Sequence, residues 1–178
     1  RESRKVAGFV SAAGPGPSAL DPQRCGPSAA VVAGVISGDM LVSRGHRETI
    51  RLRGIDAPET DQQYGPEAAA ELRLLVVGHQ LALNGPFERD RWGRLICDCT
   101  TVNAWEPESV CCHQLREGFA WVYTEFNRDP AFPPIERAAR KARAGLWGLP
   151  TRQIEPWRWR RGERVYAVDP PWPEAATH

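Results

Sequence analysis

Hydrophobic and polar residues alternate along the first part of the chain in the pattern of half-buried β-strands. The run A-V-V-A-G-V-I at residues 30–36 suits a buried strand, and apolar residues resume at 41–43. In residues 49–55, two aliphatic side chains alternate with Arg51 and Arg53. Because successive side chains of a strand point to opposite faces, both arginines should lie on the face opposite the aliphatic residues.

Three later segments show the signals of helices, at residues 65–78, 109–118 and 134–145. Pro66 and Pro134 stand in the first turn of the two longer ones, where proline is tolerated, and each of these two segments ends at a glycine. The middle segment begins with a serine, a preferred N-cap residue.

Further short strands are expected between these helices. They fall at residues 80–83, before an N-G-P turn, and at 94–99, after a D-R-W-G turn. A strand or turn covers residues 119–126. Strands come first and helices are interleaved late, which is typical of an α+β fold.

The chain of 178 residues is long enough for one hydrophobic core. We expect a flexible arm at residues 1–28, one domain at 29–149, and an extended tail rich in Pro, Trp and Arg at 150–178. In this tail, tryptophans alternate with arginines at residues 157–161, a strip that suits either contact with nucleic acid or local packing on the domain.

Charge and hydropathy argue against a strongly basic nucleic-acid-binding protein and against a membrane-spanning protein. The formal net charge is +1, so no global positive field attracts nucleic acid, and phosphate affinity must come from locally placed arginines. The chain has no run of about 18 apolar residues, so we expect no membrane-spanning helix. The sequence begins with Arg1 rather than Met, so a cleaved signal peptide cannot be checked.

Five cysteines are many for a reducing compartment. Cys97 and Cys99 share one face of a predicted strand, and Cys111, Cys112 and His113 follow on a predicted helix. This spacing lacks the paired loops of a typical zinc site, so we expect at least one disulfide between the two regions, with one cysteine left unpaired. An oxidising compartment follows, and we expect a periplasmic or secreted protein.

Three short segments carry the residues of a hydrolytic site: S-G-D-M at 37–40, R-L-R-G-I-D-A-P-E-T at 51–60, and D-R-W-G-R at 90–94. They supply three carboxylates and two guanidinium groups at strand ends and turns: Asp39, Asp56, Glu59, Arg51 and Arg94. Oxygen ligands suit a hard divalent cation, planar donors suit a phosphorane, and a carboxylate can activate water. Each segment alone also has an ordinary interpretation, as a turn former, a helix cap or a solvated strand position.

This order and spacing resemble the staphylococcal nuclease family, which carries an acidic turn, an R-x-x-x-x-D-x-P-E segment and a D-[KR]-[YW]-G-R turn. The resemblance extends from about Val31 to Trp147 and includes Y-G-P-E-A at 64–68 and A-R-A-G-L-W at 142–147. It implies an α+β fold with a five-stranded OB-type β-barrel and about three helices.

The resemblance also implies a metal site and a base. Asp39 and Asp56 would ligate Ca²⁺ through their carboxylates, Ala57 would offer its backbone carbonyl, and Glu59 would hold the attacking water.

For the substrate, the resemblance implies that Arg51 and Arg94 grip the scissile phosphate, where their planar forks make lysine a poor replacement. Trp92 would stack on a base or sugar, and Arg91 is a further candidate for substrate binding. Tyr123 suits either a nucleobase pocket or the core.

The first segment departs from the D-G-D-T turn that is common in the family. Ser37 and Met40 occupy its outer positions here. Because outer groups orient metal ligands, we expect the loss of an acidic group at Ser37 to lower calcium affinity.

The sequence thus predicts a monomeric, calcium-dependent nuclease that cuts single-stranded or frayed DNA and RNA and leaves 3′-phosphate and 5′-hydroxyl ends. Two alternatives stay open: an OB module that binds single strands or a protein without cleavage, and a structural OB domain held by disulfides.

Overall fold

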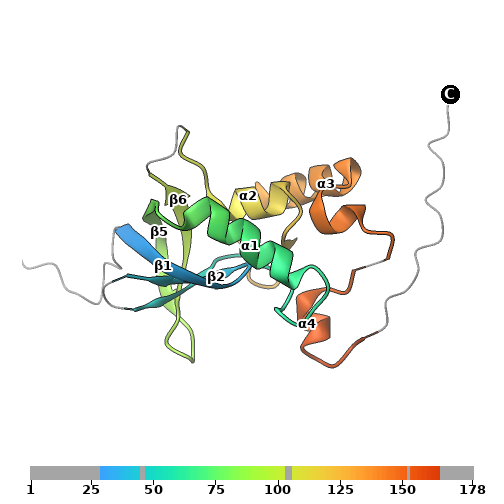
Figure 1. Cartoon of the computed structure of the whole chain (residues 1–178), viewed down its shortest axis with the longest axis horizontal. Coiled ribbons are helices and arrows are strands. Elements are labelled where there is room, and N and C mark those ends of the chain that lie inside the picture. The colour runs from blue at the N-terminus through green and yellow to red at the C-terminus, as the bar shows by residue number, and fades with distance from the viewer. Residues whose placement is uncertain (1–28, 45–46, 103–105, 152, 165–178) are drawn as a thin grey trace, which may run out of the picture.

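The computed structural model describes residues 29–44, 47–102, 106–151 and 153–164 and places a closed five-stranded barrel at the centre of the chain (Figure 1). The strands run in the order β1-β2-β3-β6-β5 around the barrel. Their bounds are β1 Ala29–Ser37, β2 Met40–Ser43, β3 Thr49–Leu52, β5 Gln80–Arg89 and β6 Leu95–Thr101. Neighbouring strands are antiparallel except β3 and β6, whose parallel pairing closes the barrel. The predicted α+β fold with an OB-type barrel is confirmed.

Three helices of seven residues or more lie among the described residues, as the sequence predicts. They are α1 Gly65–Val76, α2 Val110–Arg116 and α3 Phe132–Ala142. A two-stranded sheet pairs β4 (Ile55–Asp56) with β7 (Trp121–Val122) beside the barrel. Two short elements follow α3, the 3₁₀ turn η1 (Gly145–Gly148) and α4 (Pro156–Trp159). Figure 1 shows α4 next to the loop that precedes α1.

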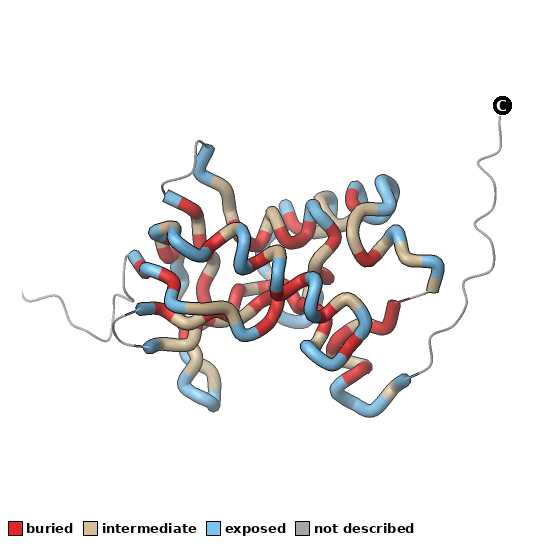
Figure 2. The backbone as a smooth tube through the Cα atoms, viewed as in Figure 1, coloured by how far each residue is buried: buried red, intermediate tan, exposed pale blue. Residues whose placement is uncertain are grey.

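The hydrophobic core fills the barrel and the space under α1 and α2 (Figure 2). In β3, Ile50 and Leu52 are buried while Arg51 faces the other side, as the alternation predicts. Helix α1 buries Leu72 and Val76 completely, and each such side chain contributes about 1.5–3 kcal/mol of transfer free energy. The same alternation that buries Ile50 and Leu52 therefore turns Arg51 to the side of β3 that faces away from the core.

Strand β5 is longer than the sequence suggests. It continues to Arg89 through Gly85 and Pro86, where a turn was expected. The pairing of β5 with β6 shifts in register between Asn84 and Glu88, and this irregularity accommodates the N-G-P segment within the strand.

The expected disulfide is wrong for the four cysteines that the structure describes. Cys97, Cys99, Cys111 and Cys112 are free thiols, and the first three are buried in the core. Burial raises the pKa of the Cys111 thiol well above its usual value. These cysteines therefore act as small apolar core residues. Cys25 lies outside the described residues.

The segment at 153–164 is not an extended tail. It forms α4, and Ile154, Pro156 and Trp159 are buried against the domain. Residues 1–28, the expected flexible arm, lie outside the described part of the chain. None of the helices in that part is both long and apolar enough to cross a lipid bilayer.

Candidate active site

The turn between β1 and β2 is fixed by the close packing of Gly38. A Cβ atom at this position would lie 2.7 Å from the Cβ atoms of both Ala57 and Ala68, so a larger residue would push these segments apart. The Gln114 side chain also donates a hydrogen bond to the Gly38 carbonyl at 2.6 Å. The next residue, Asp39, is therefore held in a fixed position with only 4% of its surface exposed.

The Asp39 carboxylate accepts hydrogen bonds on both oxygens. Ser37 Oγ donates to Oδ1 and the Ala57 backbone N–H donates to Oδ2, each at 2.8 Å. Ser37 is one of the departures from the common family turn, and here it orients the carboxylate without adding charge. Ala57, the expected carbonyl ligand, lies directly beside Asp39.

Arg51 connects the two predicted metal ligands. Its Nη2 lies 3.0 Å from Asp39 Oδ2 and 2.8 Å from Asp56 Oδ1. Its Nη1 donates to the carbonyls of Leu52 and Ile55, at 2.7 and 2.8 Å. The side chain is only 12% exposed, so these acceptors hold the guanidinium rigidly between the carboxylates.

Asp56 lies at the end of β4 and is 1% exposed. Burial raises the pKa of its carboxyl to about 6, while the hydrogen bond from Arg160 lowers it and the nearby charge of Asp39 raises it. The guanidinium groups therefore offset only part of the cost of burying the charged carboxylate, and a bound cation would act in the same direction as they do.

Arg160, immediately after α4, completes the cluster from the far end of the chain. Its Nη2 donates to Asp56 Oδ2 at 2.8 Å, and its Nη1 donates to Glu59 Oε1 at 2.6 Å. The Arg160 guanidinium thus joins Glu59, the predicted base, to Asp56, a predicted metal ligand. The sequence pattern placed this arginine in a basic aromatic strip but gave no sign of its partners.

The C-terminal segment, residues 153–164, is held near the site by aromatic contacts. The Trp157 ring stacks on Tyr123 with 5.3 Å between centroids, and Trp159 Nε1 donates to Asp61 Oδ1 at 3.1 Å. Tyr123, a predicted substrate contact, therefore has one face covered by Trp157.

Arg94 lies on the turn between β5 and β6. Its Nε pairs with Asp90 Oδ2 at 2.5 Å, and Asp90 Oδ1 also accepts from the backbone of Trp92 and of Arg94. Its Nη1 contacts the Met40 sulfur at 3.1 Å, which places Arg94 beside the turn that carries Asp39. Trp92 is 65% exposed, and the guanidinium groups of Arg91 and Arg94 lie 4.1 and 4.8 Å from its ring centroid.

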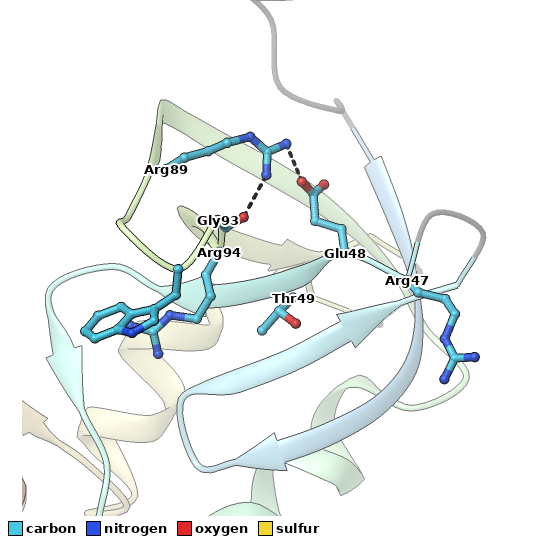
Figure 3. Close-up of a pocket in the computed structure, with 7 residues that line it drawn as sticks. Arg47, Glu48, Thr49, Arg89, Gly93 and Arg94 are labelled. Atoms are coloured by element: carbon cyan, nitrogen blue, oxygen red, sulfur yellow. Dashed lines mark hydrogen bonds and ion pairs between the residues drawn. The ribbon is translucent and has the colours of Figure 1, made fainter.

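A pocket of about 640 Å³ adjoins Arg94 (Figure 3). It is lined by Arg47, Glu48, Thr49, Arg89, Trp92, Gly93 and Arg94. Arg89 pairs with Glu48 and donates to the Gly93 carbonyl at 2.9 Å, so it joins β3 to the β5–β6 turn. Figure 3 shows Arg94 at one side of the pocket and Arg47 at the opposite side. The wall is rich in guanidinium groups, which suits a polyanionic ligand.

Comparison with known families assigns this architecture. The family model described as "Staphylococcal nuclease homologue" matches residues 49–148. The chain belongs to the staphylococcal nuclease homologue family.

Relatives occur in bacteria and plants. The chain is 34% identical over 133 residues to a protein of Escherichia coli O157:H7 named an uncharacterized endonuclease, covering 72% of this chain and 82% of the relative. It is 36% identical over 127 residues to a probable staphylococcal-like nuclease, CAN1, of Oryza sativa subsp. japonica, covering 71% of this chain and 36% of the relative. An uncharacterized 38.1 kDa protein of Capnoides sempervirens is 39% identical over 134 residues, covering 75% of this chain and 37% of the relative. The chain thus spans little more than a third of these plant relatives.

The site of this family member fits a hard divalent cation in the chemistry of its donors. Asp39 and Asp56 offer buried carboxylate oxygens, and Ala57 adds backbone beside them. Within the described residues, no group of three or more His, Cys, Asp or Glu side chains is placed to hold a metal ion.

Arg51 lies in β3 and Arg53 just after its end, and the two arginines differ in their surroundings. Arg51 enters the acidic cluster, whereas Arg53 pairs with Glu88 at 3.0 Å and donates to the Ile96 carbonyl at 2.9 Å. Arg53 is therefore an ion-paired residue outside the acidic cluster.

Proposed function

We propose that this protein is a calcium-dependent nuclease that hydrolyses phosphodiester bonds of single-stranded or frayed DNA and RNA. The observation that carries the proposal is the cluster in which Arg51 holds two buried carboxylates, Asp39 and Asp56, 3.0 and 2.8 Å from one nitrogen. Membership of the nuclease family supports it, and so does the similarity to a bacterial relative named an endonuclease.

The side chains of the cluster have distinct proposed roles. Asp39 and Asp56, with the Ala57 carbonyl, would hold calcium, which when bound supplies positive charge that polarises a phosphate oxygen. Glu59 would accept a proton from the water that attacks phosphorus in line. Arg51 and Arg94 would stabilise negative charge on the phosphorane oxygens. Such attack breaks the P–O5′ bond and leaves 3′-phosphate and 5′-hydroxyl ends.

Substrate binding is proposed for the turn between β5 and β6. Trp92 is largely exposed, and the guanidinium groups of Arg91 and Arg94 lie over its ring. A base that stacks on Trp92 would take the place of a guanidinium on the ring, while Arg91 turns to a backbone phosphate. A paired base cannot stack in this way, which favours unpaired strands.

The function is tested by incubating the protein with heat-denatured DNA and with RNA, in calcium or in chelator. Cleavage that requires calcium, with 5′ ends that polynucleotide kinase labels directly, is the expected result. Retention of the strand without cleavage would support the binding-module alternative, and neither cleavage nor retention would support a structural domain.

We further propose a periplasmic or secreted localisation and a monomeric state. The number of cysteines supports an oxidising compartment, and the four cysteines that the structure describes are free thiols.

A further inference from the structure

Arg160 lies outside residues 49–148, which match the family, yet it contacts the centre of the candidate site. Its guanidinium bridges Asp56 and Glu59, two carboxylates with different proposed tasks. One planar fork that donates to two carboxylates offsets the negative charge of both. Arg160 therefore places a positive charge close to where the proposed metal ion would bind.

The contacts of Asp56 show why Arg160 and a metal would exclude each other. Oδ1 accepts from Arg51 at 2.8 Å and from Arg160 Nη1 at 3.2 Å, while Oδ2 accepts from Arg160 Nη2 at 2.8 Å. Calcium binds oxygen at about 2.3–2.6 Å, closer than any of these donors. A cation on Oδ2 would meet the positive charge of Arg160 at short range, so that arginine must withdraw.

Arg160 can withdraw without unfolding the segment that carries it. Its side chain is 42% exposed, whereas that of Arg51 is 12% exposed and is fixed by backbone carbonyls. The anchors of the segment are separate from Arg160: Trp157 stacks on Tyr123, and Trp159 is buried. Rotation of one long side chain is therefore enough to clear Asp56.

We infer that Arg160 is a tethered cation that competes with the divalent metal for Asp56 and lowers the metal affinity of the free enzyme. This inference rests on the proposed calcium site. By linkage, metal binding and the Arg160–Asp56 contact weaken each other by the same factor. Metal bound at Asp56 would therefore displace the Arg160 guanidinium, which lies beside Glu59 in the metal-free protein.

The test compares calcium binding by the wild-type protein, Arg160→Gln and Arg161→Gln, measured by calorimetry without substrate. Arg161 is the adjacent exposed arginine and controls for the loss of one positive charge. Removal of a competing unit charge near a hard-ion site should lower the Kd of Arg160→Gln at least ~10-fold, with Arg161→Gln within ~2-fold of wild type. Circular dichroism in chelator checks that each variant is folded.

A second measurement follows the Arg160 Nε–H resonance by NMR during calcium titration. We expect it to shift in step with calcium binding. Equal Kd values for wild type and Arg160→Gln, or weaker binding by the variant, would overturn the inference and leave the proposed function intact. Absence of calcium binding in all three proteins would overturn both.

Discussion

The indole of Trp157 lies parallel to the ring of Tyr123, with an interplanar angle of 2° and 5.3 Å between centroids. This stack joins α4 to the segment after β7 and so sets the position of Arg160. Trp157→Ala should lower the free energy of unfolding by about 1–2 kcal/mol, through lost burial and lost stacking. Urea unfolding measures the effect. Trp157→Phe keeps a ring and is the control, and equal losses in both variants would show that stacking is not the cause.

Glu59 is predicted to act as the base. Glu59→Gln should keep the fold and calcium binding but slow cleavage by at least ~100-fold, the usual scale for a positioned base. Initial rates on denatured DNA at saturating calcium measure it. Glu67→Gln, on the exposed side of α1, is the matched control. A Glu59→Gln rate equal to wild type would remove Glu59 from the mechanism.

The two aspartates are predicted to bind the metal. Asp39→Asn and Asp56→Asn should each weaken calcium binding, because each removes a formal negative charge from the donor set. The Asp39 change also places an amide where two donors now point, so its thermal stability should fall as well. Calorimetric titrations that are unchanged in both variants would refute the metal assignment.

Replacement by lysine should have different effects at Arg94 and at Arg51. Arg94→Lys should cost about 2–4 kcal/mol of transition-state stabilisation, seen as a lower kcat with nearly unchanged KM, because lysine lacks the planar fork. Arg51→Lys should lose rate and also stability, since Arg51 is buried among four acceptors. Arg161→Lys, at an exposed position, is the control. Unaltered kinetics in Arg94→Lys would exclude it from phosphate contact.

The pocket beside Arg94 predicts an extension of the substrate path. Arg89→Gln should weaken binding of a single-stranded oligonucleotide in chelator and reduce the salt dependence by about one phosphate contact. Fluorescence anisotropy at several salt concentrations measures both effects. Arg137→Gln, exposed on α3, should behave as wild type, and identical slopes for both variants would argue against the path.

Local signals account for what the sequence could predict. The alternation around Ile50 and Leu52 fixed the strand and turned Arg51 away from the core, and proline and glycine marked the longer helices. The strand β5 was underestimated at Gly85 because turn chemistry was outweighed by pairing with β6.

Long-range relationships could not be predicted in the same way. The spacing of Cys97 and Cys111 indicated that their elements approach, which core packing also produces, so the disulfide did not follow. The partners of Arg160 lie 101 and 104 residues away along the chain, and no periodicity reports such a distance.

This separation orders the assembly of the site in time. Asp56 and Glu59 enter the folding domain long before Arg160 is synthesised, because a chain grows from its N-terminus. A nascent chain that ends before α4 would already contain the strands of the barrel but not Arg160. Under the proposed competition by Arg160, the site of such a chain would bind metal more readily than that of a chain that includes Arg160.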